Sequence, residues 1–264
     1  MAEGDLSVRS TLQCRDEFGA LAHTFNSMAE RVENTVITLK RFVADAAHEI
    51  NTPITALRTN LELAGAGGAP GDFQADILRA QAELERLETL TRGLLTLSRL
   101  EVQDTERLRA PVDLAALARQ MHAQYASRAE QAGIALVLDV APESVTIQAD
   151  QTQIARVFDN LLDNALKFTP SGGTVTLGVA TAPEEARLWV ADTGIGIPAE
   201  DRPRLFSRFH RGRNAAAFPG NGLGLVITKA IVEDHGGQIG VESREEGVCF
   251  TVRLPLDNSE GYQL

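Results

Sequence analysis

The chain has 264 residues and a mass of 28.4 kDa, enough for about two domains and one sizeable hydrophobic core. Its 25 basic and 36 acidic residues give a net charge of -11, which repels phosphate backbones and excludes nucleic acid as an expected partner. The two cysteines, Cys14 and Cys249, lie at opposite ends without metal-ligand spacing, which excludes a disulfide-held miniprotein and indicates a reducing compartment. No apolar run reaches the roughly 18 residues of a membrane span and residues 1–10 hold no signal-peptide core, so we expect the chain as given to be soluble.

Apolar residues spaced by threes and fours run through the first third of the chain and predict a long helix with a coiled-coil seam. The spacing follows an eleven-residue repeat from Phe25 to Ala47 and a seven-residue repeat from Ala47 to Leu61, so the supercoil is expected to change near Ala47. The predicted seam consists of Leu21, Phe25, Met28, Val32, Val36, Leu39, Val43, Ala47, Ile50, Ile54, Leu57 and Leu61.

A glycine-rich segment, Gly65 to Gly71, ends this pattern and predicts a tight connection to a second helix. Two helices joined in this way form a hairpin, which cannot enclose a core by itself. We therefore expect two copies to pair into a four-helix bundle, which makes the chain a homodimer. The second helical pattern contains Ile77, Ala80, Leu84, Leu87, Leu94 and Leu97.

A second domain is expected to start near residue 110, where Ala110-Pro111-Val112 breaks the helical pattern and β-rich runs begin to alternate with helices. The predicted fold is thus an all-α helical hairpin followed by an α/β sandwich of one sheet and a helical layer. The polar tail is expected to fray. Helices are predicted at 113–131, 151–168 and 223–235, and strands at 134–140, 144–148, 174–180, 186–191, 238–243 and 248–254.

The helix predicted at 151–168 carries a polar stripe, because Asn160, Asp163, Asn164 and Lys167 fall at i, i+3, i+4 and i+7. Taken alone, this stripe is also what a solvated amphipathic helix shows. Carboxamide oxygens are nevertheless suitable ligands for Mg²⁺, and a lysine one turn later can meet a phosphate.

Two glycine-rich segments follow this helix. Asp192-Thr193-Gly194-Ile195-Gly196-Ile197-Pro198 comes directly after a strand, where a carboxylate can accept from an exocyclic amine while bare backbone approaches a flat ring. Gly220-Asn221-Gly222-Leu223-Gly224-Leu225 opens a helix, whose free N–H groups and dipole favour phosphate. Each alone is no more than a glycine-rich turn or a flexible loop, but the stripe and both segments in this order are improbable by chance.

Together these motifs resemble the GHKL ATP-binding fold of sensor histidine kinases, gyrase-type topoisomerases, Hsp90-type chaperones and mismatch-repair ATPases. The resemblance implies ATP and Mg²⁺, with the metal near Asn160 and Asn164. Between the glycine segments, Phe206 and Phe209 match the phenylalanine box of the family, and residues 211–219 match its mobile lid. Five arginines between residues 202 and 213 supply local positive charge, and Arg211 is the lid candidate for phosphate contact. The ATP-binding residues implied are Asn160, Asn164, Lys167, Phe168, Asp192, Gly194, Gly196, Ile197, Arg211, Gly220, Gly222, Leu223 and Gly224.

The segment Phe42 to Pro53 on the first helix resembles the phosphoacceptor box of a sensor histidine kinase. His48 lies one residue past the seam position Ala47, so its imidazole is expected to reach solvent, where a neutral ring nitrogen can attack the γ-phosphate in line. The resemblance gives Glu49 the role of general base and Thr52, one turn on, that of orienting water during dephosphorylation of a partner. Pro53 cannot donate to the carbonyl four residues earlier, so a bend is expected there.

This chain departs from the family at two places. Many relatives carry Arg where this chain has Asn51, which removes a positive charge near the transferred phosphate and implies either slower transfer or compensation from the lid. The third glycine box retains only Gly247 and Phe250, and we expect that segment to be structural.

The start of the chain resembles the second half of a HAMP relay module, although a plain coiled coil has the same periodicity. HAMP implies the cytoplasmic portion of a protein anchored in the inner (plasma) membrane, with its span and sensing domain upstream. A rotation or bend arriving from this segment would then alter the seam at His48 and switch kinase and phosphatase states. The pattern lies in Asp16, Glu17, Phe18, Leu21, Phe25, Asn26 and Met28.

The expected organisation is a HAMP relay over 1–33, a dimerising phosphotransfer hairpin over 34–108, an ATP-binding domain over 109–257 and a tail over 258–264. The expected function is autophosphorylation of His48 followed by transfer to an aspartate of a cognate response regulator. Two alternatives stay open: an enzyme that mainly dephosphorylates its regulator with Thr52, and a nucleotide-gated scaffold without transfer.

Overall fold

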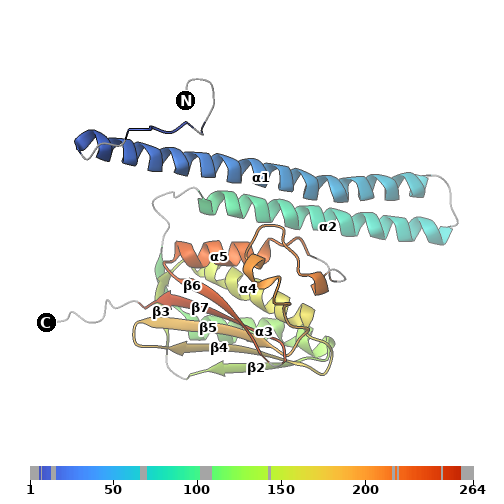
Figure 1. Ribbon diagram of the computed structural model, residues 1–264. Helices are drawn as coiled ribbons and strands as arrows, with labels where there is room; N and C mark the ends of the chain where they lie inside the picture. The colour runs from blue at the N-terminus through green and yellow to red at the C-terminus, as the bar shows by residue number, and fades with distance from the viewer. Residues whose placement is uncertain are drawn as a thin grey trace. The chain divides into compact units, whose positions relative to one another are not determined.

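The computed structural model describes residues 6, 8–12, 16–65, 70–101, 109–141, 144–215, 218, 220–244 and 246–256 (Figure 1). The tail 258–264, the connection at 66–69 and lid positions 216, 217 and 219 lie outside these residues, so the expectations for them stay predictions. The chain divides into two compact units, residues 1–84 and 85–264. Within the described ranges no helix is both long and apolar enough to cross a bilayer.

The first unit is built on α1 (Glu17–Gly65), an unbroken helix that confirms the long helix predicted from periodicity. It continues through Pro53, which is buried, and the hydroxyl of Thr52 donates to the carbonyl of His48 at 3.0 Å. A short preceding segment packs beside α1: Ser10 and Asn26 exchange two hydrogen bonds, of 2.8 and 3.0 Å.

α2 (Pro70–Glu101) follows the connection and begins in the first unit, where it turns back along α1 and confirms the helical hairpin (Figure 1). Buried residues of these helices include the small Ala29, which is completely buried, and Ala80, 6% exposed, and also Leu90 and Leu97 of α2, each 2% exposed. Many large apolar residues of α1 remain exposed, and this exposure bears on the assembly discussed below.

The second unit is an α/β sandwich, as predicted. Its five-stranded sheet has the order β2-β4-β5-β7-β6, in which only the β2–β4 pair is parallel. The helices α3, α4 and α5 cover one face of it (Figure 1). The elements are α3 (Leu114–Gln131), β2 (Ala135–Val140), α4 (Gln151–Phe168), β4 (Thr174–Thr181), β5 (Glu185–Asp192), α5 (Gly224–Asp234), β6 (Gln238–Ser243) and β7 (Val248–Pro255).

The prediction of one sheet was wrong, because a separate two-stranded sheet accompanies the five-stranded one. β1 (Ala110–Asp113) pairs antiparallel with β3 (Thr146–Ala149), so Ala110-Pro111-Val112, which we expected only to break the helical pattern, forms a strand. Pro111 lacks an N–H but is tolerated in a two-stranded sheet, where each strand has a free edge. The partner lies more than 30 residues away along the chain, which is why local pattern did not reveal the strand.

Aspartates fix where the two long helices of this unit begin. Oδ1 of Asp113 accepts from the N–H groups of Ala115 and Ala116, and Oδ1 of Asp150 accepts from those of Thr152 and Gln153. These caps satisfy backbone donors that a helix start leaves without intrahelical partners. Helix α4 then buries one apolar face and turns the other toward a cavity. The buried face consists of Ile154, Val157, Phe158, Leu161, Leu162, Ala165 and Leu166.

The β4–β5 pair contains a close contact that only glycine permits. Gly178 lies opposite Trp189, and a Cβ at Gly178 would lie 2.0 Å from Cε2 of the indole. The indole therefore covers bare backbone, and any side chain here must displace it.

Replacing Gly178 by Ala is expected to lower the free energy of unfolding by about 1–3 kcal/mol, because the added methyl overpacks against the indole. Gly240→Ala in β6, where a Cβ would meet nothing within 4 Å, is the matched control for the change in backbone freedom. Urea unfolding followed by fluorescence of the single tryptophan measures both. Equal stabilities for the two variants would contradict the packing argument.

Candidate functional site

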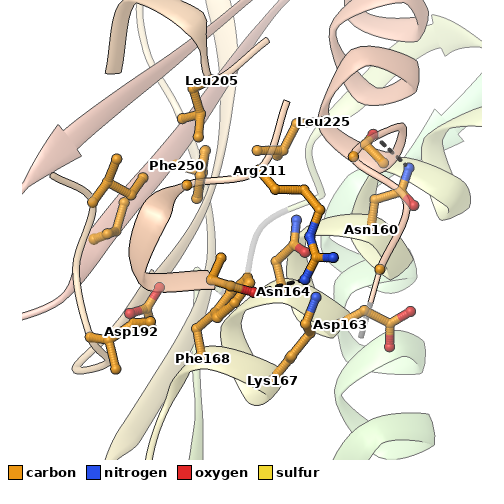
Figure 2. A pocket seen from close by; sticks show the side chains of 18 of the residues that line it. Asn160, Asp163, Asn164, Lys167, Phe168, Asp192, Leu205, Arg211, Leu225 and Phe250 are labelled. Carbon is orange, nitrogen blue, oxygen red and sulfur yellow. Dashed lines mark hydrogen bonds between the residues drawn. The ribbon is translucent and has the colours of Figure 1, made fainter. Parts of the chain in front are cut away.

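A cavity of about 350 Å³ opens between α4, the loop after β5, the segment 205–215 and the start of α5 (Figure 2). It collects residues from separate parts of the chain, the most distant of which, Arg128 and Phe250, lie 122 residues apart. Among the residues around it are Asn160, Asp163, Asn164, Lys167, Phe168, Asp192, Gly196, Ile197, Leu205, Arg211, Gly220, Gly222, Gly224, Leu225, Val248 and Phe250.

One wall is the polar stripe of α4. Asn160, Asn164 and Lys167 all line the cavity, as the helical spacing predicted. Nδ2 of Asn160 donates to the carbonyl of Gly224 and to Oγ1 of Thr228, both at 3.2 Å, which ties α4 to the start of α5. These bonds leave the amide oxygen of Asn160 available as an acceptor.

Asp192, the last residue of β5, lines the cavity away from the start of α5. It is only 8% exposed, and burial raises the pKa of its carboxyl above the ordinary value. Hydrogen bonds from the N–H groups of Gly194 and Val248, with the charge of Arg244, act in the opposite direction. The result is a desolvated acceptor whose position is fixed by backbone donors.

Two glycines allow neighbouring backbone segments to pack directly against each other around Asp192. A Cβ on Gly194 would lie 2.4 Å from the carbonyl oxygen of Phe168, which itself accepts from the N–H of Ile195 at 3.1 Å. A Cβ on Gly247, where φ is +81°, would lie 1.8 Å from the carbonyl oxygen of Asp192. Larger side chains at either position would push α4 or β7 away from the end of β5.

The segment expected to form a lid is held at several points. Arg211 donates from Nη2 to the carbonyls of Ala215, at 2.8 Å, and Phe218. Asn214 donates to the carbonyl of Gly196 at 3.0 Å. Figure 2 shows the guanidinium of Arg211 next to the Lys167 amine, and both burial and the charge of Arg211 lower the pKa of that amine.

The base of this segment is also anchored. Buried Asp201 accepts from the N–H of Arg213 at 3.0 Å, and its other oxygen lies 3.3 Å from Nε2 of His210. Phe209 has a φ of 59° and donates its N–H to the carbonyl of Gly222 at 3.2 Å. A Cβ on Gly222 would collide with Phe209, so the phenylalanine box and the second glycine segment pack directly together.

The structure thus brings most of the predicted nucleotide-binding residues into one cavity. Gly194 and Leu223 are not among the residues that line it: Gly194 packs under Asp192, and Leu223 is 1% exposed. The remaining predicted residues, His48, Glu49, Asn51 and Thr52, lie on α1 in the other unit. His48 is exposed, as its place beside the seam predicted, and Glu49 is half-buried.

Sequence reasoning missed several residues of the cavity wall. Val248 and Phe250 lie in the degenerate glycine box that we expected to be only structural, yet both line the cavity. Their alternation along β7 was a usable signal, because positions two apart share a face of a strand. Arg128 belongs to no motif and also lines the cavity, and periodicity along α3 could not reveal this.

Comparison with known proteins agrees with this geometry. Residues 149–258 match the family model described as histidine kinase-, DNA gyrase B- and HSP90-like ATPase. Residues 38–103 match the His Kinase A (phospho-acceptor) domain, and residues 1–34 match the HAMP domain.

Two curated relatives illustrate the similarity over most of the chain. The signal transduction histidine-protein kinase BaeS of Escherichia coli is 35% identical over 260 residues, which cover 97% of this chain and 55% of BaeS. The histidine-protein kinase/phosphatase MprB of Mycobacterium tuberculosis is 35% identical over 243 residues, which cover 88% of this chain and 46% of MprB. The chain spans about half the length of these relatives.

Among solved structures, the histidine kinase ThkA in complex with response regulator protein TrrA has a TM-score of 0.70 and 27% identity. The match covers 90% of this chain and 67% of that chain.

The buried Asp192 predicts a specific dependence of stability on pH. Because its pKa is raised, the folded state binds the proton more tightly than the unfolded state, so this carboxyl contributes stability at low pH that is lost as the pH rises through its native pKa. Asn cannot titrate, so the stability of Asp192→Asn relative to the unmodified chain should increase from acidic to neutral pH.

Urea titrations of both proteins over that range measure the difference. Asp139→Asn, which removes an exposed carboxylate from β2, is the control for the change in net charge. A relative stability that falls with rising pH would contradict the argument from burial.

Proposed function

Because the chain belongs to the sensor histidine kinases of two-component systems, we propose that it binds ATP, phosphorylates itself on His48 and passes the phosphoryl group to an aspartate of a response regulator. The observation that carries this proposal is the convergence of the α4 polar stripe, buried Asp192 and both glycine segments on one cavity. In the proposed organisation, residues 1–33 are part of a HAMP relay, 34–108 the phosphotransfer hairpin, 109–257 the ATP-binding domain and 258–264 a tail.

We place the adenine at Asp192, whose carboxylate accepts from the exocyclic amine. Leu205, Val248 and Phe250 supply apolar surface for the ring at that end. The phosphates then run along α4, past the positive charge of Lys167 and toward the N-terminus of α5, whose free N–H groups favour anions. Arg211 adds a further charge from the lid.

Magnesium fits the donors of this wall. Asn160 and Asn164 present carboxamide oxygens one helical turn apart, and Mg²⁺ prefers such oxygens together with phosphate and water. The described part of the chain holds no cluster of three His, Cys, Asp or Glu side chains that would favour a different metal. When bound, the ion would neutralise phosphate charge, and Asn160 and Asn164 would hold it.

The proposed transfer is a direct substitution at phosphorus. A neutral ring nitrogen of His48 forms a bond to the γ-phosphorus while the bond to the β,γ-bridging oxygen breaks, and ADP leaves. Glu49, the next residue, takes the proton from the other ring nitrogen, so the phosphorylated imidazole carries no additional positive charge. Exposure of His48 on α1 gives the nucleotide access to it. Asn51 carries no charge, so in this proposal the positive charge for the transferred phosphate comes from Arg211 of the lid segment.

A homodimer is the assembly that α1 favours. Most of its seam residues are exposed in the single chain, with Leu39 at 55%, Val43 at 58% and Ile54 at 46%. Fully burying an aliphatic side chain of this size contributes about 1.5–3 kcal/mol. Pairing two hairpins through this stripe therefore accounts for the apolar surface.

Dephosphorylation of the regulator is the second candidate activity. The Thr52 hydroxyl lies one turn after His48 and already forms a hydrogen bond to the His48 carbonyl. Rotation about its Cα–Cβ bond would free it to orient water toward a phosphoaspartate. We place both activities in the cytoplasmic portion of a membrane-anchored sensor, controlled through the HAMP segment.

Incubation with γ-labelled ATP and Mg²⁺ is expected to give acid-labile, base-stable label on the unmodified chain and none on His48→Gln, because Gln has no nucleophilic ring nitrogen. His23→Gln, at an exposed position of the same helix, is the matched control and should label normally. Label that persists on His48→Gln would place the acceptor elsewhere. Absence of label on a folded chain that binds ATP would favour the phosphatase or the scaffold.

The assembly has its own test. Leu39→Glu is expected to shift the chain from about twice the monomer mass to the monomer mass in light scattering, because it places a charge in the apolar seam. Thr38→Glu adds the same charge at a neighbouring exposed position outside the seam and should leave the mass unchanged. A monomeric unmodified chain would contradict the bundle.

A further inference from the structure

Side chains of α3 and α4 form a polar cluster beside the cavity. The Tyr125 hydroxyl lies 3.1 Å from Oδ1 of Asp159 and 3.2 Å from Oδ1 of Asp163, and its ring is buried. Nη1 of Arg128 donates to the same oxygen of Asp163. The Arg128 guanidinium also lies 5.6 Å from the centroid of the Tyr125 ring. Two contacts therefore orient the Arg128 guanidinium: an ion pair with Asp163 and a cation–π contact with Tyr125.

These contacts leave Arg128 capable of binding a second anion. A guanidinium has five N–H donors in a rigid fork, and Asp163 engages Nη1. The Arg128 side chain is 59% exposed, so its charge carries little desolvation cost before a ligand arrives. Arg128 and Asp163 both line the cavity, so the Arg128 side chain is within reach of a ligand that fills it.

The order of residues along α4 shows which part of a nucleotide Arg128 meets. Phe168, at the end of α4, contacts the loop that follows Asp192, so the adenine end of the cavity lies there. Asn160 contacts Gly224 at the N-terminus of α5, two turns of α4 earlier. Asp163 follows Asn160 by three residues on α4, and Arg128 is bonded to Asp163. Arg128, bonded to Asp163, therefore lies closer to the Asn160 end of this wall than to Phe168 and the loop after Asp192.

The other cations of the site come from different walls. Lys167 belongs to α4, where burial and the neighbouring Arg211 lower the pKa of its amine, and Arg211 belongs to the lid segment. Arg128 comes from α3, which contributes to none of the sequence motifs. It adds positive charge from a third direction at the phosphate end.

We propose that Arg128 is a phosphate-reading residue that distinguishes a nucleoside triphosphate from a diphosphate by binding the terminal phosphate. Asp163 and Tyr125 are its positioning residues, because they hold the guanidinium at the edge of the cavity. When the nucleotide binds, the N–H groups that Asp163 does not engage donate to the terminal phosphate. This inference deepens the proposed function and rests on ATP being the ligand of the cavity.

The test is calorimetric titration of the full chain with the β,γ-imido analogue of ATP and with ADP, both with Mg²⁺ at constant ionic strength. Arg128→Gln is expected to weaken binding of the triphosphate about five- to tenfold and that of ADP by less than about twofold, since only the triphosphate reaches the charge-assisted contact. Arg128→Lys, which keeps the charge without the fork, should recover part of the loss.

Arg119→Gln on the same helix removes the same charge from an exposed arginine that bonds the carbonyl of Ala141, and should change neither affinity. Tyr125→Phe is expected to weaken only triphosphate binding, by about two- to threefold, because Asp163 loses one of the donors that fix it. The readout is the ratio of the affinities for the triphosphate analogue and for ADP, which would not change if Tyr125 had only a structural role.

Two results would overturn the assignment. Equal losses for both nucleotides in Arg128→Gln would mean that Arg128 only supports the cavity wall, and unchanged affinities would mean that it contacts no phosphate. Failure of the unmodified chain to bind either nucleotide would instead overturn the proposed function, and this assignment with it.

Discussion

The nucleotide cavity depends on direct backbone contact between the end of α4 and the loop after β5. The carbonyl of Phe168 accepts from Ile195, and the space for a Cβ on Gly194 is already taken by that carbonyl. On the other side, Gly247 lies against the carbonyl of Asp192. Only glycine permits both approaches, and they place the stripe of α4 and the carboxylate of β5 around one space. An Ala at either position would be expected to separate these walls.

The same geometry distributes charge along the cavity. Asp192 is desolvated and held by backbone N–H groups, which suits an acceptor for a neutral amine. Lys167, Arg211 and Arg128 line other walls of the cavity, on α4, the lid segment and α3, and their positive charges suit phosphate. A net charge of -11 on the whole chain therefore does not prevent binding of an anionic nucleotide, because local clustering within a few ångströms outweighs distant charges screened by solvent.

The hairpin follows a different principle. Its helices have strong periodicity but little enclosed core: small residues such as Ala29 are buried, while Leu39, Val43 and Ile54 stay exposed. A partner that covers such a surface would stabilise the hairpin, so in the homodimer that we propose assembly and folding are coupled. His48 lies beside the seam rather than in it, which allows the imidazole to remain accessible when the seam is covered.

Local features of the sequence determined most of the elements and the core of the site. Periodicity predicted α1, α2 and α4, the spacing of Asn160, Asn164 and Lys167 placed them on one helical face, and glycines after a strand marked the position of Asp192. These signals depend on residues within one or two turns of each other. Tertiary structure alone decided the pairing of β1 with β3 and the exclusion of Leu223 from the cavity wall. It also brought Arg128 to Asp163, 35 residues away, because packing of α3 against α4 is set by the shared core and not by any pattern within either helix.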